Sequence, residues 1–339
     1  MENIPYNKLM AYQFLKKVGI QEVLDLKGIT EVAVNQPNRI WFDRGNGWEF
    51  IDEPRADYAS LEQLATVLSV MSNDGIPLDF NNPVSSVILP DGERGQIVIP
   101  PMIEDGCVSM TFRKPSKSRF TLSDYENTGR LSGFKYASRA SHDLSDEQKI
   151  LYKLYKEEKI KDFFIKAVEN HLNILLVGGT GSGKTTIMKA LVDLYPPTRR
   201  IFTIEDVHEL DLPNHPNHLH LFYKNKIRSP KYVIESCMRM KPDHIFLAEL
   251  RGDEAWNYIE ALNTGHSGSV TTTHANDCYS AFSRITGLVK QSEDGRTLDY
   301  DHIFKMVRSS IDIVCFFKGS FLKEIFFDPM EKNEILAMG

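Results

Sequence analysis

A glycine-rich segment offers the clearest chemistry in this chain. It fits the pattern G-x-x-x-x-G-K-[ST] and reads Gly178-Gly179-Thr180-Gly181-Ser182-Gly183-Lys184-Thr185. Its glycines let successive backbone N–H groups turn inward around phosphate oxygens. Lys184 would reach the β- and γ-phosphates, and Thr185 would hold Mg²⁺. The segment therefore predicts a nucleoside triphosphate site that extends from Gly179 to Thr186.

A triphosphate site also needs acids that hold the metal and orient water at the ends of strands beside the loop. The apolar run 244–248 ends in Glu249, which suits a Walker B element and makes Glu249, with Thr185, a candidate for holding the metal. The apolar run 201–204 is followed by Glu205, Asp206 and Glu209. One such acid is often only a solvated strand terminus, so the prediction depends on all of them occurring with the phosphate loop.

Histidines are frequent near these strands, yet they do not predict a metal site. His266 and His274 flank a strand expected at 269–273, and a metal there would need a third ligand that the sequence does not place. A second group has no acidic or cysteine partner at convincing spacing; it comprises His208, His215, His218 and His220. The four cysteines form no C-x-x-C pair, so no structural zinc is expected.

The phosphate loop lies in the part of the chain where apolar strands alternate with helices. Strands are expected at 173–177, 200–204, 244–248, 269–273 and 311–317. A helix-compatible run, 186–194, follows the loop, so the loop leads into a helix N-terminus whose positive potential favours phosphate. Apolar strands separated by helices indicate a mainly parallel sheet that is covered on both faces.

The amino-terminal third has a different pattern, in which turns separate short strands. Strands are expected at 29–35, 39–44, 48–52, 86–89, 94–99 and 107–113, and a helix around 61–71 is expected to pack on them. The intervening turns indicate hairpins and an antiparallel sheet. Alternation along the last strand places Arg113 on the polar face, at the strand end.

A polar stretch separates these two parts. Residues 115–145 contain few apolar positions to bury, which is typical of a linker with at most short helices. A length of 339 residues suits two domains. We therefore expect an amino-terminal α+β domain at 1–114, a linker at 115–145 and a nucleotide-binding α/β domain at 146–339.

The composition excludes several classes of protein. Forty basic against 46 acidic residues give a net charge of −6, which argues against nucleic acid as the main direct ligand. An apolar content of 42% and a charged content of 25% are ordinary for a globular protein and exclude extensive disorder. No stretch approaches the ~20 apolar residues that a membrane span needs. A cytoplasmic protein with reduced thiols is expected.

Four blocks of sequence stand in an order that resembles one superfamily. The blocks at 178–186, 203–209, 241–252 and 264–275 are similar to the Walker A, Asp box, Walker B and His box of the secretion ATPases. Further segments resemble the type IV secretion traffic ATPases, which form rings at the cytoplasmic base of the channel; these segments are 89–94, 112–116, 214–223 and 248–252. The resemblance covers about residues 25–330.

This resemblance implies a RecA-like P-loop NTPase domain with a mainly parallel sheet, preceded by a smaller α+β domain with an antiparallel sheet. It implies Mg²⁺-dependent ATP hydrolysis that powers substrate export or pilus biogenesis. Lys184 and Thr185 would bind phosphate and Mg²⁺. Glu209 of the Asp box would orient or activate water, and Glu249 would support the metal and the attack. One departure concerns Ala248, which stands where many members have glycine.

The resemblance also implies roles outside the loop. Arg94 and Arg113 match positions that reach the phosphates across the domain cleft, and His266 and His274 would couple the nucleotide state to the surrounding structure, with His274 near the nucleotide. The implied assembly is a homohexamer. Its implied partners are other secretion-channel ATPases, inner-membrane channel components and the secreted substrate, at the cytoplasmic side of the inner membrane.

Three alternatives remain open at this point. A type II secretion or type IV pilus motor would share the four blocks, although the lack of paired C-x-x-C motifs disfavours the zinc-bearing type II ATPases. A nucleotide-dependent switch or scaffold that does not hydrolyse ATP is the second alternative. A RecA-like nucleic-acid translocase is the third, and the acidic balance weakens it.

Overall fold

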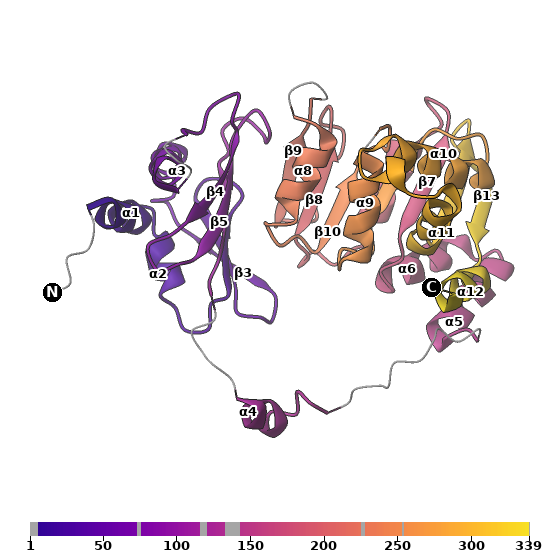
Figure 1. The fold of residues 1–339 in the computed structure, drawn as a ribbon, viewed down its shortest axis with the longest axis horizontal. Helices are drawn as coiled ribbons and strands as arrows, with labels where there is room; N and C mark the ends of the chain where they lie inside the picture. Colours follow the sequence, from indigo (N-terminus) through magenta and orange to yellow (C-terminus); the bar gives the residue numbers. More distant parts are fainter. Residues whose placement is uncertain are drawn as a thin grey trace.

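Two β-sheets, one in each half of the chain, form the framework of the computed structural model (Figure 1). The structure describes residues 6–72, 76–115, 121–132, 143–224, 228–252 and 254–338. The amino-terminal sheet is antiparallel, with the strand order β3-β2-β1-β6-β5-β4. The carboxy-terminal sheet has the order β13-β12-β7-β11-β10-β8-β9 and is parallel except for β13. The fold class expected from the sequence is confirmed.

Helices cover one face of the amino-terminal sheet, on the side away from the other sheet (Figure 1). The strands are β1 (Glu31–Val34), β2 (Arg39–Asp43), β3 (Trp48–Asp52), β4 (Val84–Ile88), β5 (Arg94–Val98) and β6 (Ser109–Arg113), and the helices are α1 (Tyr6–Lys17), α2 (Ile20–Leu24) and α3 (Tyr58–Ser72). Met110 and Phe112 of β6 join the core beneath these helices. Thr111 points to the opposite face and is still buried, because the second half of the chain covers it.

The carboxy-terminal sheet is buried on both faces, as its apolar strands predict. Its strands are β7 (Ile174–Gly178), β8 (Ile201–Glu205), β9 (His218–Phe222), β10 (His244–Leu247), β11 (Val270–Thr273), β12 (Ile313–Lys318) and β13 (Phe321–Phe327). Leu175 and Val177 of β7 join one hydrophobic core, whereas Ile174 and Leu176 join another. This alternation explains why β7 is apolar along its whole length.

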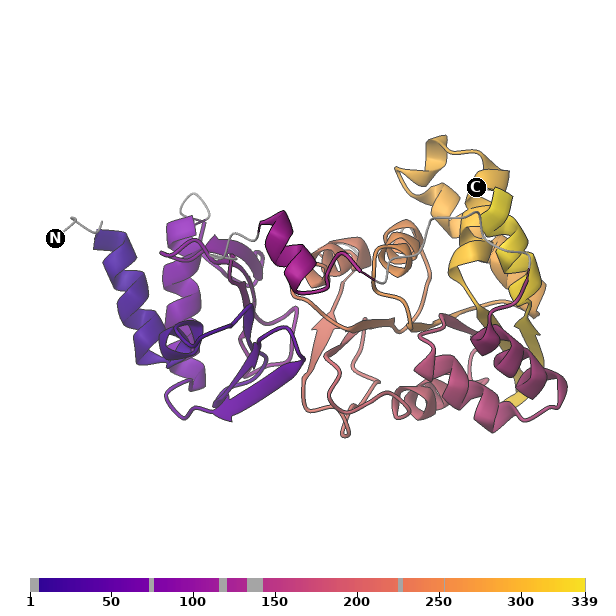
Figure 2. The same ribbon diagram turned by 90° about the horizontal axis from the view of Figure 1, so that it is seen from below.

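Helices lie on both sides of the carboxy-terminal sheet (Figure 2). The core on one face includes residues of α5 (Asp146–Lys156), α6 (Ile160–Glu169) and α7 (Lys184–Val192). The core on the other face includes residues of α8 (Pro230–Cys237), α9 (Glu254–Asn263), α10 (Cys278–Gln291) and α11 (Tyr300–Ser310). A 3-10 turn (Gly295–Thr297) precedes α11. Helix α12 (Pro329–Met338) contacts α11. In the described ranges, no helix has the length and apolarity to cross a bilayer.

Edge strand β9 joins the two halves of the chain. The backbone N–H of Phe222 donates to the carbonyl of Met102 at 2.8 Å. Ile103 forms an antiparallel bridge with Leu221. A segment that follows β5 therefore extends the carboxy-terminal sheet by backbone hydrogen bonds, which places the residues around Ile103 beside β9.

A buried arginine lies in the same interface. Arg200 has no exposed surface and donates to Asn217 Oδ1 at 2.8 Å and to Thr111 Oγ1 at 3.1 Å. Its guanidinium lies 4.8 Å from the ring of Trp48. Burial lowers the pKa of Arg200 to about 9. The two halves of the chain are thus held together by buried, specific contacts as well as by β9.

The connection between the two sheets is described only in part. It contains α4 (Leu122–Asn127), whose N-terminus is capped by Thr121 and whose residues are all exposed. This agrees with the expected short helix in a polar linker. Residues 116–120 and 133–142 of the expected linker lie outside the described residues.

Candidate active site

The phosphate loop joins β7 to α7, as the sequence predicts, and two of its glycines are required by geometry. Gly178 has a φ of 151°, and a Cβ at this residue would lie 2.3 Å from the carbonyl oxygen of Phe317. Gly183 has a φ of 84° and precedes the first residue of α7. Both backbone conformations are strained for residues with a side chain. The loop between them, from Gly179 to Gly181, is exposed.

Lys184 is the charged group of this loop and is largely buried. Its Nζ donates to the carbonyl oxygens of Gly178 at 2.8 Å and Gly179 at 2.9 Å. Burial lowers the pKa of Lys184, while the charge of Glu249 opposes the shift. Because an ammonium has three donors on a flexible stem, it can exchange loop carbonyls for phosphate oxygens. Thr185 follows it in the first turn of α7, half-buried.

A cluster of charged side chains follows the neighbouring strands. Glu249 Oε2 accepts from Arg251 Nη2 at 2.7 Å, and Glu249 Oε1 lies 3.1 Å from His274 Nε2. Arg251 Nη1 also donates to Asp206 Oδ2 at 2.9 Å. The bond with Glu249 raises the pKa of Arg251, so this guanidinium stays charged. Arg251 is not among the site residues predicted from the sequence, although its place two residues after Glu249 is a usable signal.

Sheet topology explains why these residues meet. Strands β7, β11, β10 and β8 are parallel neighbours, so their carboxyl ends share one edge of the sheet. The phosphate loop follows β7, His274 follows β11, and Glu249 follows β10. His266 precedes β11 and therefore lies at the opposite edge. Of the two histidines singled out in the sequence, only His274 joins the cluster.

The Asp box after β8 is organised by Glu205. This carboxylate is fully buried, and its Oε2 accepts from the backbone N–H groups of Glu209 and Leu210, each at 2.8 Å. Burial favours the neutral acid, but the hydrogen bonds from His220 and from these two amides outweigh it and lower the pKa of Glu205. Glu209 itself is exposed. Glu205 thus holds the loop that presents Glu209.

The two arginines lie in a basic cavity on the amino-terminal sheet. Arg94 and Arg113 are register partners in β5 and β6. They line an open cavity of about 540 Å³ together with Lys114 and Lys241. No residue of the phosphate loop, all of which is described, lines this cavity. Within one chain, the structure therefore does not bring the arginines to the phosphate loop.

A buried acid forms part of this cavity. Glu31 Oε1 lies 3.6 Å from Arg113 Nε and 3.9 Å from Lys241 Nζ. Lys241 also donates to Asp43 at 2.8 Å, which is a contact between the two halves of the chain. Burial raises the pKa of Glu31, against the opposing charges of Lys241 and Arg113. Glu31 thus links the position of Arg113 to the contact between the halves.

Comparisons with known proteins agree with this architecture. The family model described as "Type II/IV secretion system protein" matches residues 138–316. The chain is 39% identical over 326 residues to type IV secretion system protein VirB11 of Brucella suis, covering 92% of this chain and 89% of that protein. It is 38% identical over 349 residues to VirB11 of Bartonella quintana, covering 98% and 97%.

The structural match is equally extensive. The crystal structure of the VirB11 ATPase from the Brucella suis type IV secretion system, in complex with sulphate, superimposes with a TM-score of 0.88 at 38% identity. The match covers 96% of this chain and 99% of that one. It includes both sheets and confirms the resemblance drawn from the four sequence blocks. The chain therefore belongs to the type II/IV secretion system protein family and is, within it, a type IV secretion traffic ATPase of the VirB11 kind.

Proposed function

We infer that this protein hydrolyses ATP with Mg²⁺ to power substrate export, pilus biogenesis or both in a type IV secretion system. One observation carries the proposal: the phosphate loop, Glu249 and His274 meet at one edge of a parallel sheet. Phosphoryl transfer depends mainly on positioning and charge, which this edge supplies.

Each residue of the site has a defined task in this proposal. The backbone N–H groups from Gly179 to Thr186 and the ammonium of Lys184 bind the phosphates. Hard oxygen donors suit Mg²⁺, and the hydroxyl of Thr185 and the carboxylate of Glu249 provide them. The metal, when bound, neutralises charge that develops on the phosphates. Glu209 orients the attacking water from its exposed loop.

The basic cavity completes the site from a neighbouring copy in a homohexamer. Arg94 and Arg113 are exposed on the amino-terminal sheet and are apart from the phosphate loop of their own chain. Arginines that arrive only on assembly would make hydrolysis depend on the conformation of the ring. The ring would sit at the cytoplasmic face of the inner membrane, with other channel ATPases, channel components and the secreted substrate as its partners.

Mixed rings test this proposal. Lys184→Ala and Arg113→Ala should each abolish or strongly reduce ATP turnover in uniform rings. Rings co-assembled from both variants at equal amounts, and purified through a different tag on each, should recover up to about one quarter of the wild-type rate, because a quarter of the sites combine an intact loop with an intact neighbouring arginine.

The outcomes separate the parts of the proposal. Normal turnover of Lys184→Ala would overturn the assignment of the phosphate loop. Inactive mixed rings would leave the loop assignment intact and reject completion by a neighbour. Lys189→Ala is the matched control, because Lys189 is an exposed lysine in the same helix, and we expect it to keep wild-type turnover.

A further inference from the structure

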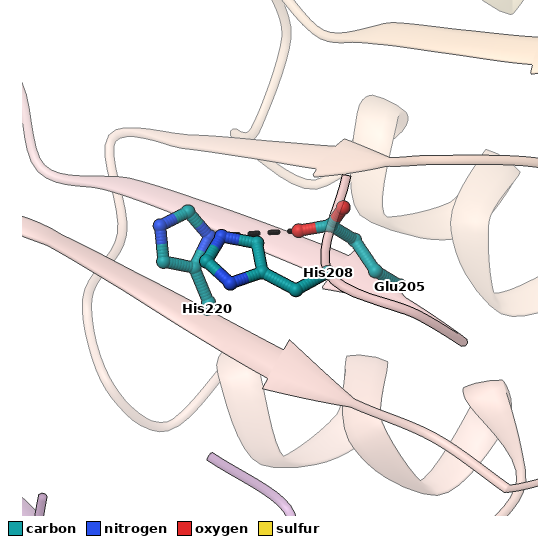
Figure 3. Close-up of side chains that lie close together, drawn as sticks. All are labelled: Glu205, His208 and His220. Atoms are coloured by element: carbon teal, nitrogen blue, oxygen red, sulfur yellow. Dashed lines mark ion pairs between the residues drawn. The ribbon is translucent and has the colours of Figure 1, made fainter. Parts of the chain in front are cut away.

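A glutamate and a histidine of the Asp box lie close to a histidine of β9 (Figure 3). The ligand atoms of Glu205, His208 and His220 all lie within 4.8 Å of one another. Glu205 and His220 are buried, whereas His208 is exposed. No zinc is expected here from the sequence, because no acidic partner stands at convincing spacing from the histidines. Pairing of β8 with β9 supplies that partner.

The parallel register of β8 and β9 explains why Glu205 and His220 lie close together. Thr203 of β8 is aligned with His220 of β9, and Glu205 follows two residues later on the same face as Thr203. The hydroxyl of Thr203 donates to Glu205 Oε1 at 2.7 Å and also lies 2.7 Å from His220 Nδ1. The second oxygen of Glu205 is held by backbone N–H groups. Both buried residues are therefore oriented by neighbours, as metal ligands commonly are.

His208, the exposed histidine of the cluster, is also oriented by its neighbours. Its Nε2 lies 3.0 Å from the carbonyl oxygen of Leu210, which can only accept, so Nε2 carries the proton. In a neutral ring the lone pair is then on Nδ1. This atom lies 3.5 Å from a carboxylate oxygen of Glu104. A lone pair on Nδ1 and a carboxylate oxygen at this separation can both become ligands of one metal ion.

Glu104 reaches the cluster because of the contact between the two halves of the chain. It follows Ile103, which forms the antiparallel bridge with Leu221 of β9. The side chain of Glu104 is partly exposed, like that of His208. Two of the four candidate ligands, Glu205 and His220, are thus buried and held by neighbours. The other two, His208 and Glu104, are at the surface, where an ion can enter.

We propose that Glu205, His208 and His220, with Glu104 as the fourth donor, bind a divalent transition-metal ion of the Zn²⁺ type. Two imidazoles and two carboxylates are a donor set that Zn²⁺ favours, whereas Mg²⁺ and Ca²⁺ prefer oxygen ligands alone. The inference does not depend on ATP hydrolysis, because no residue of the phosphate loop takes part.

Binding requires the cluster to contract. Metal–ligand bonds of ~2.0–2.1 Å place tetrahedral ligands ~3.3 Å apart, whereas His208 Nδ1 and Glu104 Oε1 are 3.5 Å apart and the other ligand atoms lie within 4.8 Å of one another. The exposed side chains of His208 and Glu104 can rotate inward, while Glu205 and His220 stay in place. The ion would then tie the Asp-box loop and β9 to the segment that carries Glu104, across the contact between the two halves of the chain.

Metal binding to the untagged full-length protein tests the proposal. After treatment with a chelator, titration with ZnCl₂ should show about one tight site per chain by calorimetry and by metal analysis after desalting. His208→Ala and Glu104→Gln should each weaken that site at least about tenfold. Excess MgCl₂ should not displace the zinc. His302→Ala is the matched control, because His302 is an exposed histidine outside the cluster, and it should bind zinc like the wild type.

Several results would overturn the proposal. One is the absence of a tight site in the wild type. Another is equal zinc binding by the wild type, His208→Ala and Glu104→Gln, since both substituted residues are at the surface and their loss leaves the core intact. Loss of zinc from Glu249→Gln but not from His208→Ala would place the ion at the nucleotide site instead.

Discussion

Two glutamates at the carboxyl ends of neighbouring strands have opposite surroundings. Glu205 is the last residue of β8 and is fully buried, and backbone N–H groups of the following loop donate to its carboxylate. Glu249 lies two residues after β10, and its carboxylate contacts the exposed side chains of Arg251 and His274. Since β8 and β10 pair in parallel, strand position alone does not distinguish the two acids.

The comparison shows that the groups around a carboxylate determine whether it is suited to a structural or to a catalytic role. The backbone donors of Glu205 cannot leave without moving the loop that carries Glu209. The partners of Glu249 are exposed side chains, which change rotamer rapidly and can give way to a metal ion or water. Glu249 is therefore suited to a reaction cycle, and Glu205 is suited to holding a loop.

The largest expected effect would separate the two acids by activity. Glu249→Gln preserves the shape of the side chain and removes its charge, so ATP turnover should fall at least ~100-fold, the usual contribution of an acid or base in the attack. Phosphate release at saturating MgATP measures this loss. Nucleotide binding and the melting temperature should stay near those of the wild type.

The same variant decides between two functions. If Glu249→Gln hydrolyses no ATP but still supports secretion in a complemented strain, a non-hydrolysing switch would replace the motor. If folded Glu205→Gln lost turnover as completely as Glu249→Gln while keeping its stability, the comparison between the two acids would fail.

The second effect concerns stability, and here the larger loss is expected for Glu205→Gln rather than for Glu249→Gln. Glu205→Gln leaves backbone N–H groups without their charged acceptor, which should cost about 2 kcal/mol of unfolding free energy. In a chain of this size the melting temperature should fall by about 3 °C. Differential scanning calorimetry measures the shift. Glu249→Gln should change it less, because the partners of Glu249 are exposed side chains and ion pairs at the surface contribute at most ~1 kcal/mol.

The smallest effect is the pH dependence of the difference in melting temperature between the wild type and Glu205→Gln. The pKa of Glu205 is lowered below its ordinary value of 4.5 in the folded protein, so its ionised form stabilises the fold above pH 4.5. This stabilisation is lost as the pH falls from 4.5 through the lower folded pKa. The gap in melting temperature between the wild type and Glu205→Gln should therefore narrow below pH 4.5. A constant gap down to pH 3 would show that the charge of Glu205 is not what holds the loop.

The sequence predicted the phosphate loop well because the signal is local. Gly178 and Gly183 have backbone conformations or close approaches that need glycine, and the expected helix follows, although it begins at Lys184, two residues before the run expected at 186–194. The apolar run before the loop is buried on both faces, as predicted. Local steric demands of this kind are written in consecutive residues and need no tertiary contact to be recognised.

Strand β9 was missed, although a signal was present. The alternation His-Leu-His-Leu-Phe at 218–222 has the period of a strand. The alternation is short, and its polar positions are histidines, which also suit a ligand group. Strand β13 was also not predicted; it pairs antiparallel with β12 at the sheet edge, and its residues are largely exposed or half-buried. An edge strand of this kind lacks the apolar run that marks the central strands.

By itself, the sequence determined the parallel and antiparallel sheets, the phosphate loop and the acids that follow the strands, because local periodicity and glycine geometry encode them. Only the tertiary structure decided which acid is buried among backbone donors and which contacts exposed charged side chains. It also brought Glu205 to the histidines of β9 and kept Arg113 apart from the phosphate loop of its own chain. The physical reason is that solvation and charge at a residue depend on neighbours distant in sequence, which strand pairing and the contact between the two halves of the chain determine.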